Sequence, residues 1–400
     1  MLVDLAQPGQ VSDIVRVMGA ARLDEMVREA AQALRAALGD DRQAYHVGST
    51  QFAFLAPEGV ELDRYFPLLQ QEFKAIRATS SARFVTTVAV GIMPFQLGSI
   101  PASDVLRGAH SASQDARADH GGIKIHSPDS DLVHRRRLDL LQEFGEAVEG
   151  AEQLSLVFQP RVDMADGRCV GAEALLRWRH PRLGNVPPSE FIPLIERTVM
   201  VRQTTDWVMK AALRQAGEWG RENVRMPVSI NISAANLGEA DLVQRLQLYL
   251  LKYRVAPEMV ELELTESAVM SDGTHMRACL QELADTGVRI AIDDFGTGYS
   301  SLAYLQRVPA HVVKIDQSFI RNLATDERDR ALVATMIRLS HELGYRVVAE
   351  GIETPDIVEH LRAMGCEEAQ GYLFGRPMEG ASFDHWLQEN HKPQGQAAAA

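Results

Sequence analysis

The runs MVELELT (259–265), VRIAIDD (288–294) and HVVKID (311–316) decide the fold of this chain. Each is short and mainly apolar, and helix-like segments separate them. Five further runs continue the pattern: LSLVFQP (154–160), CVGAEALLRW (169–178), PVSINIS (227–233), YRVVAE (345–350) and AQGYLF (369–374). Eight strands alternating with helices over about 240 residues predict an α/β protein with a (β/α)8 barrel. A doubly wound open sheet is the alternative, although no glycine-rich phosphate-binding fingerprint follows any of the runs.

The rest of the sequence suggests four regions. Gly, Ser, Pro and Asp are frequent between Gly121 and Asp131, which predicts a boundary after a smaller N-terminal domain of residues 1–130. Apolar residues with helical spacing follow, so we expect a helical connector over 131–150 and the barrel over 151–390. The alanine-rich tail, 391–400, is expected to be disordered.

Composition excludes several classes of protein. The 400 residues are 46% hydrophobic and 24% charged, values that are typical of a chain with full hydrophobic cores. No stretch approaches the ~20 apolar residues of a membrane span, and the N-terminus lacks the features of a secretory signal, so we expect a cytoplasmic protein. The three cysteines lie far apart and indicate neither disulfides nor a zinc site. A net charge of −13 opposes binding to long nucleic acids.

Polar residues stand near the carboxyl ends of the predicted strands, where the catalytic groups of a (β/α)8 barrel gather. They alternate with apolar residues along each strand, so they point away from the helix-facing side. Six such side chains are Glu173, Asn231, Glu263, Asp293, Lys314 and Glu350. Asp294 joins them because FGTG follows it directly and lets the chain turn. One such acid alone is more often a solvated loop residue or a helix cap, but a shared position on successive strands indicates a site.

The chemistry of this set favours a metal centre. Five carboxylates around one barrel mouth would repel each other strongly unless they were protonated or neutralised. Oxygen ligands without His or Cys favour Mg²⁺ or Mn²⁺ over zinc. Adjacent Asp293 and Asp294 suit two metals ~4 Å apart, the arrangement used for in-line hydrolysis of a phosphodiester. Lys314 could hold the attacking water or balance phosphate charge, and Glu350 could act as a general base.

At these residues the sequence resembles the EAL-domain family of cyclic di-GMP phosphodiesterases. The signature stands as Glu173-Ala174-Leu175. Eight further motifs follow the order of the family between about residues 154 and 387: FQP (158–160), PPSEFIPLIE (187–196), NIS (231–233), ELTES (263–267), DDFGTGYSSL (293–302), KID (314–316), AEGIE (349–353) and QGYLFGRP (370–377). The resemblance implies hydrolysis of cyclic di-GMP to linear 5′-pGpG, and no catalytic position of the barrel departs from the family pattern.

The resemblance also implies a role for each matching residue. The ligands of a first metal would be Glu173, Asn231, Glu263 and Asp293, whereas Asp293 and Asp294 would serve a second. Lys314 and Glu350 would position or activate the attacking water. Residues similar to the family's substrate contacts are Gln159, Arg177 and Gln370, with Glu353 as a second acid of the site and Asp316 as a nearby acid. Glu266 resembles the residue that anchors the DDFGTGYSS loop.

Each of these assignments has a simpler alternative. Arg177 could form a surface ion pair, and the two glutamines could be solvated. Glu266 could be only an acid at the start of a helix. For the whole barrel, the competing hypothesis is a receptor that binds cyclic di-GMP without cleaving it, and a weaker one is a scaffold that acts through protein contacts.

Residues 1–130 resemble a GGDEF diguanylate cyclase domain that has lost its chemistry. A helix-like segment (23–38), a hairpin-like run (45–57) and a strand-like run (84–94) follow that family's order. The signature position reads GSTQF (48–52), without the carboxylates that a metal-dependent cyclase needs. Asp4 is similar to the family's other metal-binding acid and Asp24 to a guanine-contacting acid, but GDDR (39–42) lacks the inhibitory Arg-x-x-Asp motif.

Two roles are open for this N-terminal domain. It could be a regulatory module that binds GTP or a protein partner, or a scaffold for packing and dimerisation. The resemblance further implies a homodimer formed near the DDFGTGYSS loop. It also implies a bacterial second-messenger enzyme that influences motility and biofilm formation.

Overall fold

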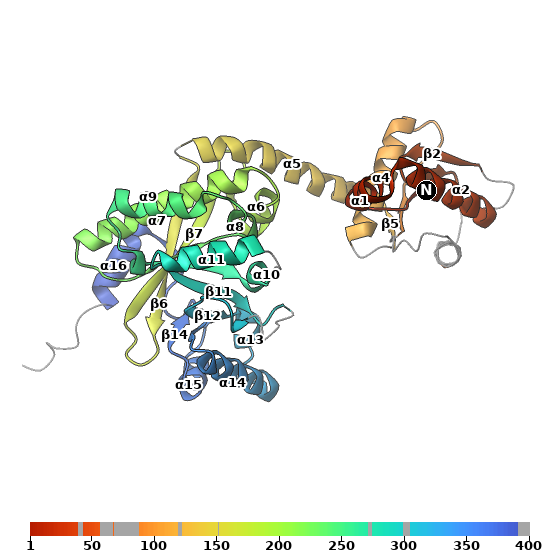
Figure 1. The fold of residues 1–400 in the computed structure, drawn as a ribbon. Coiled ribbons are helices and arrows are strands. Elements are labelled where there is room, and N and C mark those ends of the chain that lie inside the picture. Colours follow the sequence, from red (N-terminus) through yellow and green to blue (C-terminus); the bar gives the residue numbers. More distant parts are fainter. Residues whose placement is uncertain are drawn as a thin grey trace, which may run out of the picture. The chain divides into compact units, whose positions relative to one another are not determined.

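The structure is a computed structural model that describes residues 1–38, 43–56, 67, 88–118, 122–150, 152–270, 274–298 and 305–390. The chain divides into two compact units, Met1–Arg136 and Arg137–Ala400 (Figure 1). Helix α5 (Pro128–Glu149) runs across this division. The motif GDDR (39–42), the end of the DDFGTGYSSL motif and the tail 391–400 lie outside the described residues, and the four predicted regions stay predictions.

The first unit contains a sheet with strand order β2-β3-β1-β4-β5. Its strands are β1 (Leu2–Asp4), β2 (Ala44–Gly48), β3 (Gln51–Phe54), β4 (Ala89–Ile92) and β5 (Ile123–Ile125). The helices are α1 (Pro8–Met18), α2 (Ala20–Leu38) and α4 (Ala102–Ala118). Leu34 and neighbouring apolar residues of α2 pack on Val3, Phe52 and Val90 of the sheet. This α/β unit precedes the barrel, as the sequence predicts.

Eight strands of the second unit form a closed ring, which confirms the predicted TIM-like barrel. They are β6 (Leu154–Asp163), β7 (Cys169–His180), β9 (Val228–Asn231), β10 (Val260–Thr265), β11 (Arg289–Phe295), β12 (Val312–Ile315), β13 (Arg346–Ala349) and β14 (Glu368–Gln370). Two short strands, β8 (Gly184–Val186) and β15 (Met378–Glu379), pair at the margin. Because the ring is closed, the carboxyl ends of seven parallel strands surround one mouth.

The first barrel strand differs from the regular pattern that the sequence analysis assumed. Strand β6 is antiparallel to both of its neighbours, β7 and β14. Only residues 164–168 connect β6 to β7. A parallel connection needs a dozen or more residues, so this short link permits a hairpin and leaves no room for a helix. The expectation of a helix between every pair of strands is therefore wrong at this point.

Helices form the outer layer around the barrel strands (Figure 1). They include α6 (Pro188–Ile195), α7 (Met200–Arg221), α8 (Ala234–Leu237), α9 (Leu242–Tyr253), α10 (Glu266–Val269), α11 (Thr274–Asp285), α13 (Gln317–Ile320), α14 (Glu327–Glu342), α15 (Pro355–Ala363) and α16 (Gly380–Asn390), with a 3-10 turn over Pro257–Met259. The core between layers is made by outward-facing apolar residues such as Ile230, Leu262 and Ile292. Among the described residues, no helix is both long and apolar enough to cross a membrane.

Candidate active site

The predicted site residues come together at the carboxyl ends of the barrel strands. Glu173 lies on β7, Glu263 on β10 and Lys314 on β12. Asn231 and Gln370 are the last residues of β9 and β14, and Glu350 directly follows β13. Each is two positions from another inward-facing residue, while its apolar neighbours face the helices. The alternation of apolar and polar residues along each strand therefore brings distant parts of the sequence to one mouth.

Lys314 is the centre of this arrangement. Its side chain is 1% exposed, and Nζ lies 2.7 Å from Glu350 Oε1 and 2.9 Å from Glu263 Oε2. The same nitrogen lies 3.3 Å from Asp293 Oδ1 and 3.4 Å from Glu173 Oε2. A buried ammonium requires neighbouring negative charge, and here four carboxylates supply it. One lysine cannot neutralise all four.

Two polar side chains fix the orientation of Glu173. Asn231 Nδ2 donates a hydrogen bond to Glu173 Oε1 at 3.0 Å, and Gln370 Nε2 donates to Oε2 at 2.6 Å. Gln370 also donates to Gln159 Oε1 at 3.2 Å, and Gln159 Nε2 donates to the carbonyl of Gly375. The two glutamines are buried within the site instead of solvated, so they connect β6 and β14 to the signature glutamate.

The pKa values of these groups reflect burial and crowding. Burial and the Glu173 carboxylate raise the pKa of Glu263 well above its usual range. Burial raises the pKa of Glu350 to about 8, and the Lys314 ammonium offsets only part of that effect. For Glu173, burial alone would raise the pKa, but Lys314 and the hydrogen bonds from Gln370 and Asn231 outweigh it and lower the pKa. The site therefore holds protonated and ionised carboxylates together near neutral pH.

Asp293 and Asp294 both turn toward the mouth although they are adjacent in the sequence. The register between β11 and β12 shifts between Ile292 and Phe295. Asp293 and Asp294 on β11 therefore lie together opposite the single residue Lys314 on β12. Asp294 has a φ of 54°, which bends the strand locally. A β-bulge of this kind cancels the usual alternation and redirects a side chain. Burial and the charge of Asp293 raise the pKa of Asp294.

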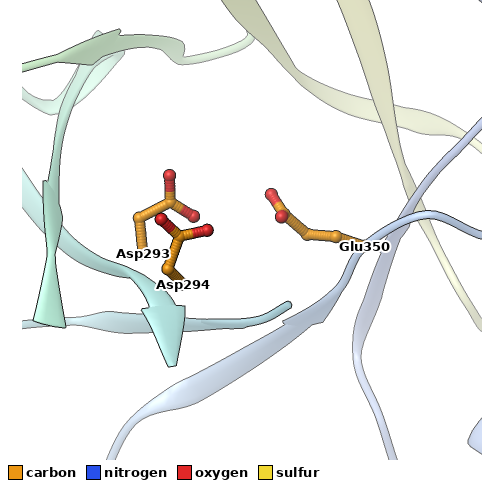
Figure 2. A group of neighbouring side chains, drawn as sticks. All are labelled: Asp293, Asp294 and Glu350. Atoms are coloured by element: carbon orange, nitrogen blue, oxygen red, sulfur yellow. The ribbon is translucent and has the colours of Figure 1, made fainter. Parts of the chain in front are cut away.

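Asp293, Asp294 and Glu350 point toward one another across the barrel mouth (Figure 2). One carboxylate oxygen from each lies within 4.8 Å of the others. Glu263 Oε1 is a buried oxygen that accepts no hydrogen bond from the described residues, and buried Asp293 Oδ1 has the Lys314 ammonium 3.3 Å away. A buried oxygen without a donor, in a site where four carboxylates share one ammonium, fits the ligand set of a hard divalent cation. The residues present thus fit a Mg²⁺-type metal centre.

Glu266 lies at the start of α10 and also contacts the segment after Asp294. Its Oε2 accepts hydrogen bonds from the backbone N–H groups of Gly296 at 2.8 Å and Gly298 at 3.4 Å. A Cβ at position 298 would lie 2.8 Å from Glu266 Oε1, so any other residue there would push this carboxylate away. The two sequence interpretations of Glu266, a helix-start acid and a loop anchor, are both compatible with this geometry.

A cleft of about 310 Å³ opens beside these groups. The predicted substrate contacts that line it are Gln159, Arg177, Glu353 and Gln370. Arg177 donates to the carbonyl of Leu176 at 2.9 Å, and partial burial lowers the pKa of its guanidinium. Asp316 differs from these residues because its carboxylate caps α13 by accepting from the Ser318 N–H at 2.9 Å, and it does not line the cleft.

The sequence analysis assigned no role to several other residues of the mouth. Gln317, Arg321 and Tyr372 line the cleft, and the Arg376 guanidinium lies 4.3 Å from the centroid of the Tyr372 ring. Tyr372 stands inside the QGYLFGRP motif, which was the available clue. A second cavity of about 670 Å³ shares Arg177 and Asp293 with the cleft and continues between α6 and α7. Its walls depend on helix packing, which the strand pattern does not reveal.

In the N-terminal unit, Asp4 lies among residues that include two from the signature position GSTQF (48–52). Asp4 is buried, and Arg117 Nη2 lies 3.3 Å from its Oδ1. Gln51 Nε2 and Gln114 Nε2 donate to Asp4 Oδ2 at 3.3 and 3.2 Å. Thr50 Oγ1 lies 3.4 Å from Oδ1. An arginine and neutral polar groups thus surround the acid that resembles a cyclase metal ligand, while Asp24 is exposed.

Comparison with known proteins supports the resemblance of the barrel to EAL domains. The EAL domain model matches residues 141–377. The chain is 35% identical over 387 residues to cyclic di-GMP phosphodiesterase PA2567 of Pseudomonas aeruginosa, covering 96% of this chain and 66% of the relative. It is 42% identical over 245 residues to MucR of the same bacterium, a bifunctional diguanylate cyclase/cyclic di-GMP phosphodiesterase, covering 61% of this chain and 36% of the relative.

A solved structure gives a similar result. The structure of the PaMucR phosphodiesterase in complex with c-di-GMP superposes with a TM-score of 0.59 at 41% sequence identity. The match covers 61% of this chain and 99% of that chain. This chain therefore spans 66% or less of the two curated relatives, whereas its barrel spans nearly all of the solved phosphodiesterase unit.

Proposed function

This chain belongs to the EAL-domain family, and on that premise we propose that its barrel hydrolyses cyclic di-GMP to linear 5′-pGpG with two Mg²⁺ or Mn²⁺ ions. The observation that carries the proposal is the charge imbalance at the mouth. One ammonium, Lys314, faces four carboxylates, and the buried oxygen Glu263 Oε1 has no hydrogen-bond donor among the described residues. Divalent cations would supply the missing positive charge.

Each site residue has a role in this proposal. The side chains that would hold the first cation are Glu173, Asn231, Glu263 and Asp293, and those for the second are Asp293 and Asp294. When bound, the two cations polarise the phosphodiester and lower the pKa of water. Glu350 accepts a proton from the attacking water at a carboxylate oxygen, while Lys314 Nζ holds Glu350 at 2.7 Å and balances charge on the phosphate.

The bond that breaks follows from the product. Water adds to phosphorus, and the bond from phosphorus to the 3′-oxygen breaks, so the phosphate stays on the 5′-carbon of pGpG. The leaving 3′-oxygen takes up one proton, which balances the proton that Glu350 accepts from the attacking water. Arg177 offers a guanidinium fork to a phosphate or to a guanine edge, and Gln159, Gln370 and Glu353 line the cleft that would receive the nucleotide. In this scheme Asp316 acts indirectly, because its carboxylate caps α13 and so helps to hold that helix in place.

The alternative proposal is a receptor that binds cyclic di-GMP without cleavage. A receptor of this family would typically have a disrupted metal motif, and every metal-ligand position of this barrel carries the expected residue. Hydrolysis is therefore the stronger proposal. For the N-terminal unit, we propose a GGDEF-like domain without cyclase activity that regulates or supports the barrel, through GTP, a protein partner or homodimer contacts.

The test is chromatography of cyclic di-GMP incubated with the purified chain in Mg²⁺, Mn²⁺, Ca²⁺ or EDTA. We expect pGpG with Mg²⁺ or Mn²⁺, none with EDTA, and loss of the product in Glu173→Ala. Glu327→Ala, which removes an exposed acid on α14, is the matched control and should keep full turnover. Intact nucleotide in every metal, together with tight binding, would replace hydrolysis by the receptor proposal.

A further inference from the structure

A second layer of side chains lies directly beneath the active site. Because residues two apart on a strand share a face, each site residue has an inward-facing neighbour roughly 7 Å deeper in the barrel. On β6, which runs in the opposite direction, that neighbour is two positions later. The members of this lower layer are Arg161, Gly171, Ser229, Glu261, Ala291, Val312, Val348 and Glu368.

The lower layer has an apolar half and a charged half. Ala291, Val312 and Val348 form a buried apolar cluster beneath Asp293, Lys314 and Glu350. The other half is organised by one guanidinium. Arg161 pairs with both oxygens of Glu261, with Nη2 3.4 Å from Oε2, and its Nε lies 2.7 Å from Glu368 Oε2.

Neighbouring groups complete the charged half. Ser229 Oγ donates to Glu261 Oε1 at 2.9 Å, and Arg346 Nη2 lies 3.0 Å from Glu368 Oε1. Two arginines thus face two glutamates, so this layer is balanced in charge and has no need of a cation. Gly171 makes room for the guanidinium, because a Cβ there would lie 3.1 Å from Arg161 Nε and Nη2.

Stability alone does not account for this buried network. Replacing a buried ion triad by well-packed apolar residues is often neutral or stabilising. The apolar cluster in the other half of the same layer demonstrates that apolar side chains fit at this depth of the barrel. The planar guanidinium of Arg161 donates its hydrogen bonds in fixed directions. It therefore holds the three strands that it links at defined positions relative to one another.

The strands that Arg161 links are those that carry the two glutamines and a predicted metal ligand. Gln159 is two positions from Arg161, Glu263 two from Glu261, and Gln370 two from Glu368. Gln370 bridges the upper layer through hydrogen bonds of 3.2 Å to Gln159 and 2.6 Å to Glu173. A small shift of β14 against β6 would break that bridge.

We propose that Arg161 is a positioning residue of the active site: by joining β6, β10 and β14 beneath the mouth, it aligns the metal ligands and the two glutamines above it. The proposal rests on the proposed function, because alignment matters only if the mouth binds metal and nucleotide. Residues that orient metal ligands from outside the ligand set typically change metal affinity 10- to 100-fold when altered.

The decisive variant is Arg161→Lys, which keeps the charge but lacks the planar fork. Its Mn²⁺ dissociation constant is measured by calorimetry on the full chain without nucleotide, and KM and kcat follow from the chromatographic assay. We expect Mn²⁺ affinity to fall about tenfold and KM to rise by a similar factor, with an unchanged circular dichroism spectrum. The metal titration needs no turnover, so it reports alignment independently of catalysis.

Arg245→Lys is the matched control. Arg245 on α9 lies 2.8 Å from Asp206 and also pairs with Glu239, so it is a buried arginine among acids on the outer helices. This control should lower the melting temperature yet leave Mn²⁺ affinity and KM within twofold. If Arg161→Lys behaves in the same way, Arg161 is only structural and the proposal is overturned.

A second variant covers the case in which Arg161→Lys does not fold. Gly171→Ala adds one methyl group 3.1 Å from Arg161 Nε and Nη2, which shifts the guanidinium by a few tenths of an ångström while every charge is kept. We expect weaker Mn²⁺ binding here too, and unchanged binding in a folded Gly171→Ala protein would contradict the proposal. If the wild-type chain binds Mn²⁺ but leaves cyclic di-GMP intact, the proposed hydrolysis fails, while the Mn²⁺ affinities still decide the role of Arg161.

Discussion

The ammonium of Lys314 lies 2.7 Å from Oε1 of Glu350, which follows the neighbouring barrel strand. The same nitrogen approaches Glu263, Asp293 and Glu173. Burial alone would lower the pKa of Lys314, but Asp293 and the other carboxylates outweigh it and hold the pKa well above its usual range. Lys314 is therefore a permanent cation that gathers the acids of four strands at one point without neutralising them.

This relationship predicts the effect of Lys314→Gln. The variant should lose hydrolysis by roughly 10²- to 10³-fold, since a buried charge that faces the reacting phosphate is removed. Without metal its melting temperature should fall, because several carboxylates would remain crowded in a buried site. Added Mn²⁺ should then stabilise it more than it stabilises the wild type, as thermal melts with and without metal will measure. Lys210→Gln, on the exposed side of α7, should change neither property.

Metal binding should depend on pH. In the metal-free protein burial raises the pKa of Glu350 to about 8, so this carboxyl carries a proton at pH 7, and burial also raises the pKa of Glu263. A divalent cation favours the ionised carboxylates and should displace protons from them. We therefore expect Mn²⁺ affinity to increase from pH 6 to pH 8, with proton release visible by calorimetry in buffers of different ionisation enthalpy. Glu350→Gln should release fewer protons, and a pH-independent affinity would contradict this assignment.

The anchor at Glu266 should be needed for catalysis more than for folding. Glu266→Ala removes the acceptor for the N–H groups of Gly296 and Gly298, which lie two and four residues after Asp294. We expect kcat to fall about tenfold or more, because the two aspartates would lose a fixed position. Glu266→Gln keeps an acceptor oxygen and should retain much of the activity. Equal losses in both variants would assign the effect to the charge of Glu266 instead of its hydrogen bonds.

Much of the mouth could be predicted because strand geometry is simple. Side chains alternate along a strand, so the parity of Asn231, Glu263 and Lys314 indicated which face they share, and their place near strand ends indicated the mouth. The reversed direction of β6 could also have been predicted from the sequence. Asp166-Gly167 stands in the short link between the runs at 154 and 169, and such a pair is typical of a hairpin turn.

Contacts that depend on packing between strands or helices were beyond the sequence. Arginine is rarely buried, so nothing near FQP indicated that Arg161 enters the barrel to meet Glu261 and Glu368. Asp316 belongs to KID, yet the turn after β12 uses its carboxylate as the cap of α13. In both cases the partner of the side chain is decided by tertiary geometry, which residue spacing does not contain.

The N-terminal unit should not make cyclic di-GMP from GTP. Its buried Asp4 lies against Arg117, and the hairpin between β2 and β3 presents Thr50 and Gln51 to it, so this group lacks the second carboxylate that a cyclase metal site needs. The sharpest assay incubates Glu173→Ala with GTP in Mg²⁺ or Mn²⁺, because an inactive barrel cannot remove any cyclic di-GMP that forms. We expect GTP to stay intact. Accumulation of cyclic di-GMP would establish a cyclase whose metal ligands lie elsewhere in the unit, and would overturn its proposed regulatory or supporting role.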